Sequence, residues 1–432
     1  MSMRKSCLLA LVLPIVAMSC QKVSCDVAMR EDIKNSAETN LYAVGIDDAL
    51  AKLDNELNII YGSSTRSCLS RPQVRKVYTL HYDEITTSTR SGDIDVNELL
   101  YIVEFDEGCG SAILGADSRL EDVYAVLEDG VISKSDFQQA ELGADVQELP
   151  IYLAGRILDE VNDRLGGITI DSLPVVPAKP TIKEIDTITN RSNSFYVRTK
   201  WYQDSPFSNE CIDPLNPGVV NKAGCGPIAI GQILAHNQQY GNLSINNQTF
   251  DMSLINCKRP WHDLYNDSSV NSEVARFIHQ IGLEMDADYG TSLTITAYNK
   301  MEEFLSNVYS NVEDEEYDFD TIISHMDEYS VPLAIYDVSH GWVIDGYYWL
   351  VIMYRLPVET LPGVHIVHEV NNKKVHCNFG WGGNWDGYYS SGIFDLSNPA
   401  TGDDIITSVG DHNSATTDID LSEGLRIVYY NL

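Results

Sequence analysis

Three prolines within seven residues, Pro174, Pro177 and Pro180, interrupt any regular structure near the middle of this 432-residue chain. Proline lacks an amide donor and fixes its own φ angle, so such a cluster disfavours helices and strands. We therefore predict a linker at residues 171–198 between two folded units. Its basic residues, Lys179, Lys183, Arg191 and Arg198, also make it a target for proteolysis.

The first unit, residues 21–170, is predicted to be α+β behind a short polar tether. Apolar residues recur at near-helical spacing from about residue 40 to residue 61. Strand-like pieces, a turn and a second helix follow at Val77–Tyr82, Leu99–Phe105, Ser111–Ile113, Glu128–Gly130 and Leu149–Leu165. No residue of this unit suggests chemistry of its own.

The second unit, residues 199–432, is predicted to be helical in its first half and strand-rich in its second half. That layout also indicates an α+β fold. The predicted strands are Pro332–Tyr336, Trp342–Ile344, Tyr348–Tyr354, His365–Glu369, Lys374–Asn378 and Gly387–Ser391.

The formal net charge of -34, from 63 acidic and 29 basic side chains, limits the choice of partners. A field of this sign repels phosphate groups, so we expect no nucleic acid partner. Solubility is the simplest reason for the acidity, and steering of basic substrates is left open.

Residues 1–20 resemble a bacterial lipoprotein signal peptide. Arg4 and Lys5 precede an apolar run, Cys7–Ala17, which is too short to span a bilayer as a stable helix. Small residues then lead to Cys20, the cysteine that would carry the lipid after cleavage. We expect a protein bound to the membrane of the bacterial cell envelope through this lipid. The alternative is an ordinary secretory signal and a secreted protein.

Seven of the nine cysteines lie beyond this signal. No paired CxxC spacing occurs, so we expect no metal and no other cofactor. An odd number of cysteines leaves at least one thiol unpaired in an exported monomer. A disulfide between Cys211 and Cys257 is conceivable, but the sequence leaves the pairing open.

Cys225 has the surroundings of a reactive thiol. A glycine turn precedes it, Pro227 suits the first turn of a helix, and an apolar run continues to Ala235. At a helix N-terminus the dipole favours the thiolate and lowers the thiol pKa. A buried structural cysteine would give the same pattern, so position alone does not decide between the two.

A thiolate nucleophile needs an imidazole that pairs with it and later protonates the leaving amine. His340 stands at the mouth of an apolar strand, between the small residues Ser339 and Gly341. Asn378 lies before a segment rich in glycine and tryptophan and could orient the imidazole. Gln203 could donate its side-chain amide to an oxyanion. Each of these side chains also has a purely structural explanation.

The order Gln203, Cys225, His340, Asn378 resembles that of papain-like peptidases. The local strings WYQDSPF, AGCGPIAIGQIL, MDADYG, HGWVIDG and HCNFGWGGNWDGYY are most similar to the streptopain family and cover roughly residues 200–390. The resemblance implies a papain-like fold with a helical part and an antiparallel sheet. It also implies an inactive precursor whose N-terminal prodomain blocks the cleft, and Tyr101–Gly130 is similar to a segment of such a prodomain.

The resemblance further implies a cysteine endopeptidase that hydrolyses peptide bonds through an acyl-enzyme. Cys225 would attack, His340 would protonate the leaving amine, and Asn378 would orient His340. Gln203 and the Cys225 amide would hold the oxyanion. The substrate-binding residues would be Trp381, Met285, Ser339 and Gly341. The expected partners are protein or peptide substrates and the chain's own prodomain as inhibitor.

Two departures from the family pattern concern the region after His340. Phe379 stands where streptopain has a tryptophan, so a packing role could persist but an indole hydrogen bond could not. His340 and Asn378 are 38 positions apart (378 minus 340), more than in the family. We attribute the excess, roughly Leu350–Asn372, to an inserted hairpin or loop near the cleft.

Two other functions are compatible with these residues. The same machinery could transfer an acyl group to an amine, as in transglutaminase-like enzymes. The chain could also be a surface binding lipoprotein on a degenerate protease fold. The presence of Cys225, His340, Asn378 and Gln203 together favours the peptidase over the binding protein.

Overall fold

The computed structural model describes residues 42–62, 71–81, 98–142, 148–166, 185–193, 197–213, 216–256, 267–297, 299–337, 339–357, 365–395 and 425–432. The predicted signal peptide with Cys20, the three linker prolines and Cys257 lie outside these residues. The predicted lipid attachment therefore stays a prediction, whereas Cys211, one partner of the conceivable disulfide, is a buried free thiol in the structure.

The N-terminal part, defined here as the described residues between 42 and 166, contains three helices and four strands. The helices are α2 (Ile46–Gly62), α3 (Lys134–Glu141) and α4 (Leu149–Gly166). The strands are β1 (Val74–Thr79), β2 (Leu100–Phe105), β3 (Ser111–Gly115) and β4 (Val123–Leu127). The predicted helices are confirmed, whereas β1 begins three residues before the predicted strand and β4 was not predicted.

The C-terminal part, defined as the described residues between 197 and 432, begins with helices and ends with strands, as predicted. Its helices are α5 (Cys225–Asn237), α6 (Met252–Ile255), α8 (Ser268–Glu284), α9 (Asn299–Val308), α10 (Phe319–Tyr329) and the short η2 (Ser391–Ile393). Its strands are β6 (Asn242–Ile245), β7 (Gln248–Asp251), β8 (Ser310–Glu316), β9 (Leu333–Tyr336), β10 (Gly341–Pro357), β11 (His365–Asn378), β12 (Gly387–Ser390) and β13 (Arg426–Asn431).

One large antiparallel sheet joins the two parts. Its strand order is β1-β2-β3-β4-β12-β11-β10-β9-β13-β8, and the remaining strand, β5 (Ile185–Asn193), pairs with β10. The junction is the pairing of β4 with β12, in which Leu127 lies opposite Gly387 and Ala125 lies opposite Tyr389. The predicted α+β class is confirmed, because helices pack on an antiparallel sheet in both parts.

Alternate residues along the strands pack into different cores, as the two-residue period of a strand requires. In β9, Leu333 and Ile335 belong to a core that also contains residues of α3, α4 and α10. The intervening Ala334 and Tyr336 belong to a core built with α5, α8 and α9. Both faces of β9 are therefore covered, and the helix that begins at Cys225 packs against the sheet that carries His340.

The structure corrects the prediction for the linker. Residues 171–198 are not irregular throughout, because Ile185–Asn193 form β5, which is antiparallel to Tyr347–Tyr354 of β10. The strand obtains its hydrogen bonds from β10, a partner far away in the sequence. Arg191 of β5 is further held by an ion pair with Asp327.

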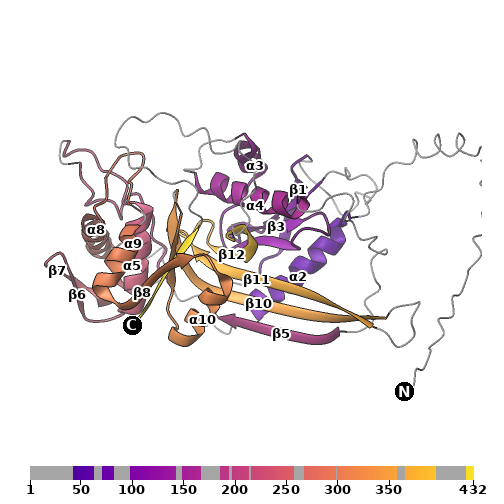
Figure 1. Ribbon diagram of the computed structural model, residues 1–432. Helices are drawn as coiled ribbons and strands as arrows, with labels where there is room; N and C mark the ends of the chain where they lie inside the picture. The colour runs from indigo at the N-terminus through magenta and orange to yellow at the C-terminus, as the bar shows by residue number, and fades with distance from the viewer. Residues whose placement is uncertain are drawn as a thin grey trace, which may run out of the picture. The chain divides into compact units, whose positions relative to one another are not determined.

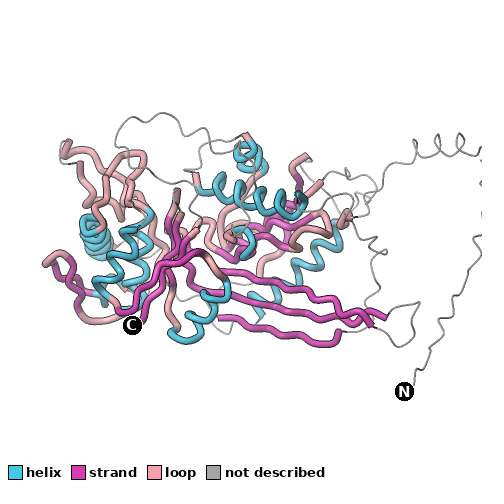
Figure 2. Tube along the Cα trace, in the orientation of Figure 1, coloured by secondary structure: helices cyan, strands magenta, loops and turns pink. Residues whose placement is uncertain are grey.

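The predicted insertion is a hairpin. Strands β10 and β11 each run continuously where two shorter strands were predicted, and they stay paired from Val343–Asn378 to Pro357–His365. Figures 1 and 2 show β5, β10 and β11 side by side as the longest strands of the sheet. The hairpin contacts the N-terminal part, because Tyr348 and Asn372 donate hydrogen bonds to Glu56 of α2.

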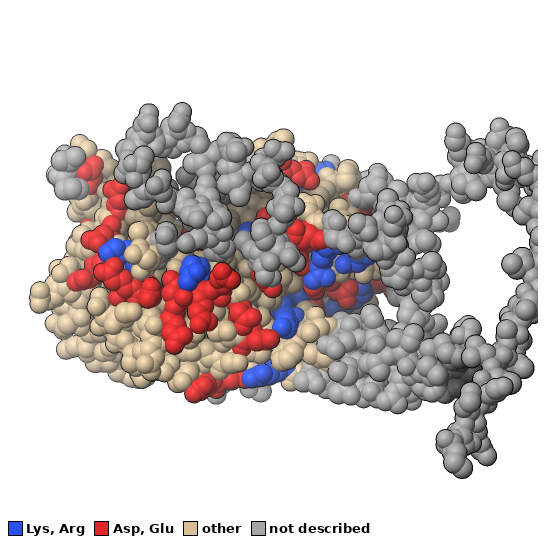
Figure 3. Space-filling view, viewed as in Figure 1, with Lys and Arg blue, Asp and Glu red and all other residues tan. Residues whose placement is uncertain are grey.

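Acidic side chains cover more of the described surface than basic side chains in the space-filling view (Figure 3). Strand β8 contributes four consecutive acidic residues, Glu313 to Glu316, at one edge of the sheet.

No helix among the described residues is long and apolar enough to cross a membrane.

Candidate active site

Cys225 is the first residue of α5, a helix that is buried from Gly226 to Ala235. The helix is preceded by Gly224, whose φ of 90° favours glycine. A side chain at Gly224 would also meet Thr294, because a Cβ there would lie 3.0 Å from Cγ2 of that residue. This turn leaves Cys225 partly exposed at the N-terminus of a buried helix.

Three hydrogen bonds hold the chain just before the nucleophile candidate. The Ala223 amide donates to the Gln203 carbonyl at 2.8 Å, and the Lys222 amide donates to the Gly290 carbonyl at 2.9 Å. The Thr294 hydroxyl donates to the Lys222 carbonyl at 2.7 Å. The backbone of Gln203 therefore lies beside the turn, and the oxyanion role of its side chain stays a prediction. Its side-chain amide has no hydrogen-bond partner among the described residues.

His340 lies on the tight turn that connects β9 to β10. The Asp337 amide donates to the His340 carbonyl at 2.9 Å across this turn. The imidazole lies against two rings, with centroid distances of 5.9 Å to Trp342 and 6.3 Å to Phe379. Phe379 is buried, so the packing role expected at this position is present without an indole.

Cys225 and His340 each shift the pKa of the other. Burial alone would raise the pKa of the Cys225 thiol, but the charge of His340 and a hydrogen bond to it lower that pKa below its usual value. The amides of Gly341 and Gly226 act in the same direction. Burial alone would lower the pKa of the His340 imidazole, but Cys225 raises it. Both directions favour thiolate and imidazolium.

Asn378 is engaged elsewhere. Its Oδ1 accepts from the Gln232 side chain at 3.0 Å and from the Gly380 amide at 3.1 Å, and its Nδ2 donates to the Thr199 carbonyl at 3.1 Å. Within the described part of the chain, Asn378 makes no hydrogen bond to His340. To orient His340 in the predicted way, Asn378 would have to exchange these partners.

The predicted substrate-binding residues are distributed around the pair. Met285 is fully buried, and its Cε would lie 3.2 Å from a Cβ at Gly226, so it packs beneath the nucleophile helix. Gly341 adjoins His340, and its amide contributes to lowering the pKa of the Cys225 thiol. Ser339 donates its amide to Asp337. Trp381 is half-buried and packs edge-on against Trp385, 5.9 Å away.

A buried charge cluster connects the N-terminal part to the strands beside the site. Glu128, which follows β4, lies 3.4 Å from Lys200 Nζ and 3.5 Å from His376 Nε2. Lys200 also pairs with Asp386 at 2.8 Å, and His376 Nδ1 lies 2.6 Å from Asp345. Burial alone would lower the pKa of His376, but Asp345 and Glu128 raise it to about 10. His376 is therefore cationic at neutral pH.

Two residues at this site were missed by sequence reasoning. Asp337 accepts hydrogen bonds from the backbone amides of Ser339 and His340, which lie two and three positions later in the chain. An Asp side chain that bonds to the amides following it is a known turn signal. Glu128 was interpreted only as part of a turn. Its contacts with Lys200 and His376 come from distant segments, so no local signal reveals them.

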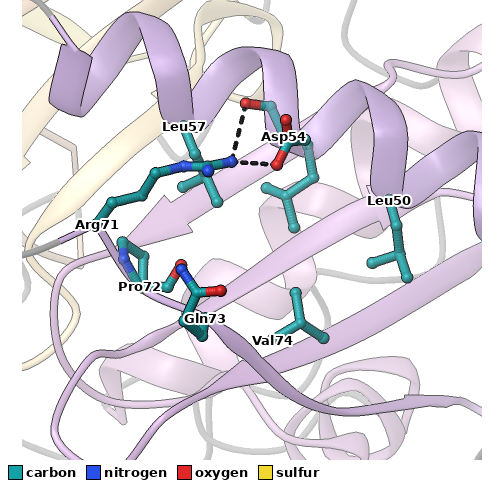
Figure 4. Close-up of a pocket in the computed structure, with 8 residues that line it drawn as sticks. Leu50, Asp54, Leu57, Arg71, Pro72, Gln73 and Val74 are labelled. Atoms are coloured by element: carbon teal, nitrogen blue, oxygen red, sulfur yellow. Dashed lines mark hydrogen bonds and ion pairs between the residues drawn. The ribbon is translucent and has the colours of Figure 1, made fainter.

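One recess among the described residues lies away from the candidate active site. Among them, no group of three or more His, Cys, Asp or Glu side chains is arranged to hold a metal ion. A small recess of about 70 Å³ lies between α2 and β1 (Figure 4). It is lined by Leu50, Leu57 and the Asp54–Arg71 ion pair, among others, and includes none of the predicted catalytic residues.

Comparison with known proteins agrees with the resemblance stated from the sequence. Residues 201–389 match the Peptidase C10 family. A solved fragment of prointerpain A from Prevotella intermedia is 16% identical over 83% of this chain and 98% of that chain, with a TM-score of 0.48. The active interpain A cysteine protease of the same organism is 18% identical over 59% of this chain and 98% of that chain, with a TM-score of 0.33. No curated protein matches the chain significantly.

Proposed function

Because residues 201–389 match the Peptidase C10 family, we propose that the protein is the precursor of a cysteine endopeptidase whose nucleophile is Cys225. The proposal is supported most directly by the mutual effect of Cys225 and His340 on their pKa values. A thiol at the start of a buried helix, with its pKa lowered by an adjacent imidazole, is the arrangement that thiol proteases require.

The proposed reaction starts from the thiolate–imidazolium pair. The Cys225 sulfur attacks the scissile carbonyl carbon, and the carbonyl oxygen becomes an oxyanion near the Gln203 amide and the Cys225 backbone N–H. The C–N bond then breaks as His340 gives its proton to the leaving amine, which leaves a thioester. Water attacks the thioester, His340 takes up a proton, and release of the acid product restores the thiolate.

The N-terminal part is proposed to be the prodomain of this precursor. It extends the sheet of the C-terminal part through β4 and β12, and Tyr152 of α4 reaches the turn that carries His340. Activation would require a cut within residues 179–198. The cut could lie before or after strand β5, which pairs with β10. Sequencing the N-terminus of the active form tests this proposal, and an active form that keeps residues 40–167 would contradict it.

Export is a separate proposal that rests on the sequence of residues 1–20. We propose that Cys20 is lipidated and holds the precursor at the bacterial cell envelope. Metabolic labelling with a fatty-acid analogue should label the wild-type protein and not Cys20→Ala. Secretion of an unlabelled protein would instead favour an ordinary signal peptide.

Casein cleavage and active-site labelling together test the proposed function. The wild-type chain should process itself or be processed, cleave casein, and react at Cys225 with a thiol-reactive peptide epoxide. Cys225→Ala should lose cleavage and labelling by several orders of magnitude. Cys109→Ala is the matched control, because Cys109 is another partly exposed thiol and belongs to the N-terminal part.

Three results would contradict or change the proposal. Casein cleavage by a matured Cys225→Ala protein would show that another residue is the nucleophile. Absence of both cleavage and labelling in a processed wild-type protein would favour a binding module. Transfer of the acyl group to an added amine in place of hydrolysis would identify an acyl transferase.

A further inference from the structure

The turn that carries His340 is stabilised by one carboxylate. Asp337 Oδ1 accepts the backbone amide of Ser339 at 2.8 Å and that of His340 at 2.9 Å. The backbone amide of Asp337 donates to the His340 carbonyl across the same turn. Three hydrogen bonds thus connect Asp337 to the backbone of Ser339 and His340, from which the imidazole projects.

The charge of this carboxylate also acts on the imidazole. Asp337 contributes to raising the pKa of His340, after the larger effect of Cys225, against the opposing effect of burial. The Phe379 carbonyl acts on the His340 pKa in the same direction. Asn378 does not supply this support, because its Oδ1 accepts from Gln232 and Gly380.

We propose that Asp337 is a positioning residue that fixes the His340 turn and stabilises the imidazolium through its charge. This inference rests on the proposed function. It assigns the role of orienting His340 to Asp337, which is not one of the four motif residues Gln203, Cys225, His340 and Asn378. Asp337 does not touch substrate or the reacting atoms, and it acts through His340. Without its charge, the imidazolium loses its proton at a lower pH, and the thiolate then lacks a proton donor for the leaving amine.

The N-terminal part contacts the same carboxylate. The Tyr152 hydroxyl of α4 donates to Asp337 Oδ2 at 2.6 Å, and the Tyr152 ring lies edge-on to Trp342 at 6.2 Å. In the full chain, Asp337 therefore has one oxygen bonded to the His340 turn and the other to the N-terminal part. Removal of the N-terminal part takes away the Tyr152 donor and leaves the bonds to the turn intact.

Two substitutions separate the backbone bonds from the charge. Asp337→Asn keeps an oxygen that can accept the two amides but carries no charge, whereas Asp337→Ala removes both. Asp318→Asn is the matched control. Asp318 likewise accepts a backbone amide, that of Thr321 at 2.6 Å, but it caps α10 and is not in the His340 turn.

The pH profile of kcat/KM for a peptide substrate provides the first measurement. The alkaline limb of the matured Asp337→Asn enzyme should lie at lower pH than that of the wild type, because the imidazolium is less stable. Asp337→Ala should lose about 100-fold in kcat/KM even near neutral pH, as expected when the imidazole is misplaced. Asp318→Asn should match the wild type. Superimposable profiles of Asp337→Asn and the wild type would overturn the proposal.

An NMR titration of the His340 imidazole in the full chain provides a second measurement that needs no catalysis. In a Cys225→Ala background, adding Asp337→Asn should lower the pKa of His340, and adding Asp318→Asn should leave it unchanged. No change with Asp337→Asn would overturn the proposal for Asp337. A lower pKa in this background, together with no peptide cleavage by the matured enzyme that keeps Cys225, would support Asp337 while refuting the proposed peptidase function.

Discussion

Glu128→Gln is the substitution that best tests how the N-terminal part is held. Glu128 follows β4, and its side chain is only 13% exposed between Lys200 and His376. Burial alone would raise its pKa, but hydrogen bonds and charges from His376 and Lys200 lower the pKa from 4.5 to about 2. At about 1.4 kcal/mol for each pKa unit, this drop corresponds to about 3 kcal/mol of stabilisation at neutral pH.

We expect Glu128→Gln to lower the free energy of unfolding of the full chain by up to about 3 kcal/mol. Urea unfolding at pH 7 measures this change, in a Cys225→Ala background that prevents self-processing. Glu121→Gln is the control, because Glu121 pairs with Arg164 inside the N-terminal part. That partly exposed pair should contribute less than about 1 kcal/mol.

The pH dependence of the unfolding free energy tests whether the charge of Glu128 causes the stabilisation. A carboxyl group whose pKa is lower in the folded chain than in the unfolded chain stabilises the fold above its unfolded pKa. It loses that effect as the pH falls through its folded pKa. The difference between wild type and Glu128→Gln should therefore be constant above about pH 5 and shrink as the pH falls towards 2. Equal losses for Glu121→Gln and Glu128→Gln, or a difference independent of pH, would refute the reasoning.

Two glycine substitutions should act on different forms of the protein. A Cβ at Gly387 would lie 2.3 Å from the Val126 carbonyl oxygen of β4, so Gly387→Ala should lower the unfolding midpoint of the full chain. Its φ of 157° also disfavours a side chain, so the matured form, which lacks β4, should lose less stability than the full chain; an equal fall in the unfolding midpoint of both forms would show that Gly387 acts outside this junction. Gly224→Ala should cost about 1–3 kcal/mol in stability and lower kcat/KM of the matured form about 10- to 100-fold. Stability falls because a side chain is strained at a φ of 90°, and kcat/KM falls because this turn positions Cys225. Unchanged kinetics would contradict the role of the turn.

The sequence predicted those features that depend on local patterns. Gly224, Pro227 and the apolar run after them predicted a buried helix that starts at Cys225, and α5 begins at that residue. His340 was placed before an apolar strand, and β10 begins at the next residue, Gly341. In both cases neighbouring residues determine the element, so the separate predictions of thiol and imidazole could be made without knowing the rest of the fold.

Features that depend on distant segments were not predictable in this way. The linker prolines predicted irregular structure, so β5 was missed. Its strand geometry comes from hydrogen bonds with β10. The acidic strand β8 has low intrinsic strand propensity and is stabilised by pairing with β13. The partners of Asn378 are Gln232, Thr199 and Gly380, so its engagement away from His340 follows from tertiary packing.

The rate of alkylation of Cys225 by iodoacetamide, measured against pH, tests the central claim most directly. In the wild-type chain the reactive thiolate should persist to a pH below the ordinary thiol range, because His340 lowers the pKa of Cys225. In His340→Ala the profile should move to higher pH, since burial then raises that pKa without the opposing charge. Identical profiles for the two proteins would contradict the thiolate–imidazolium pair.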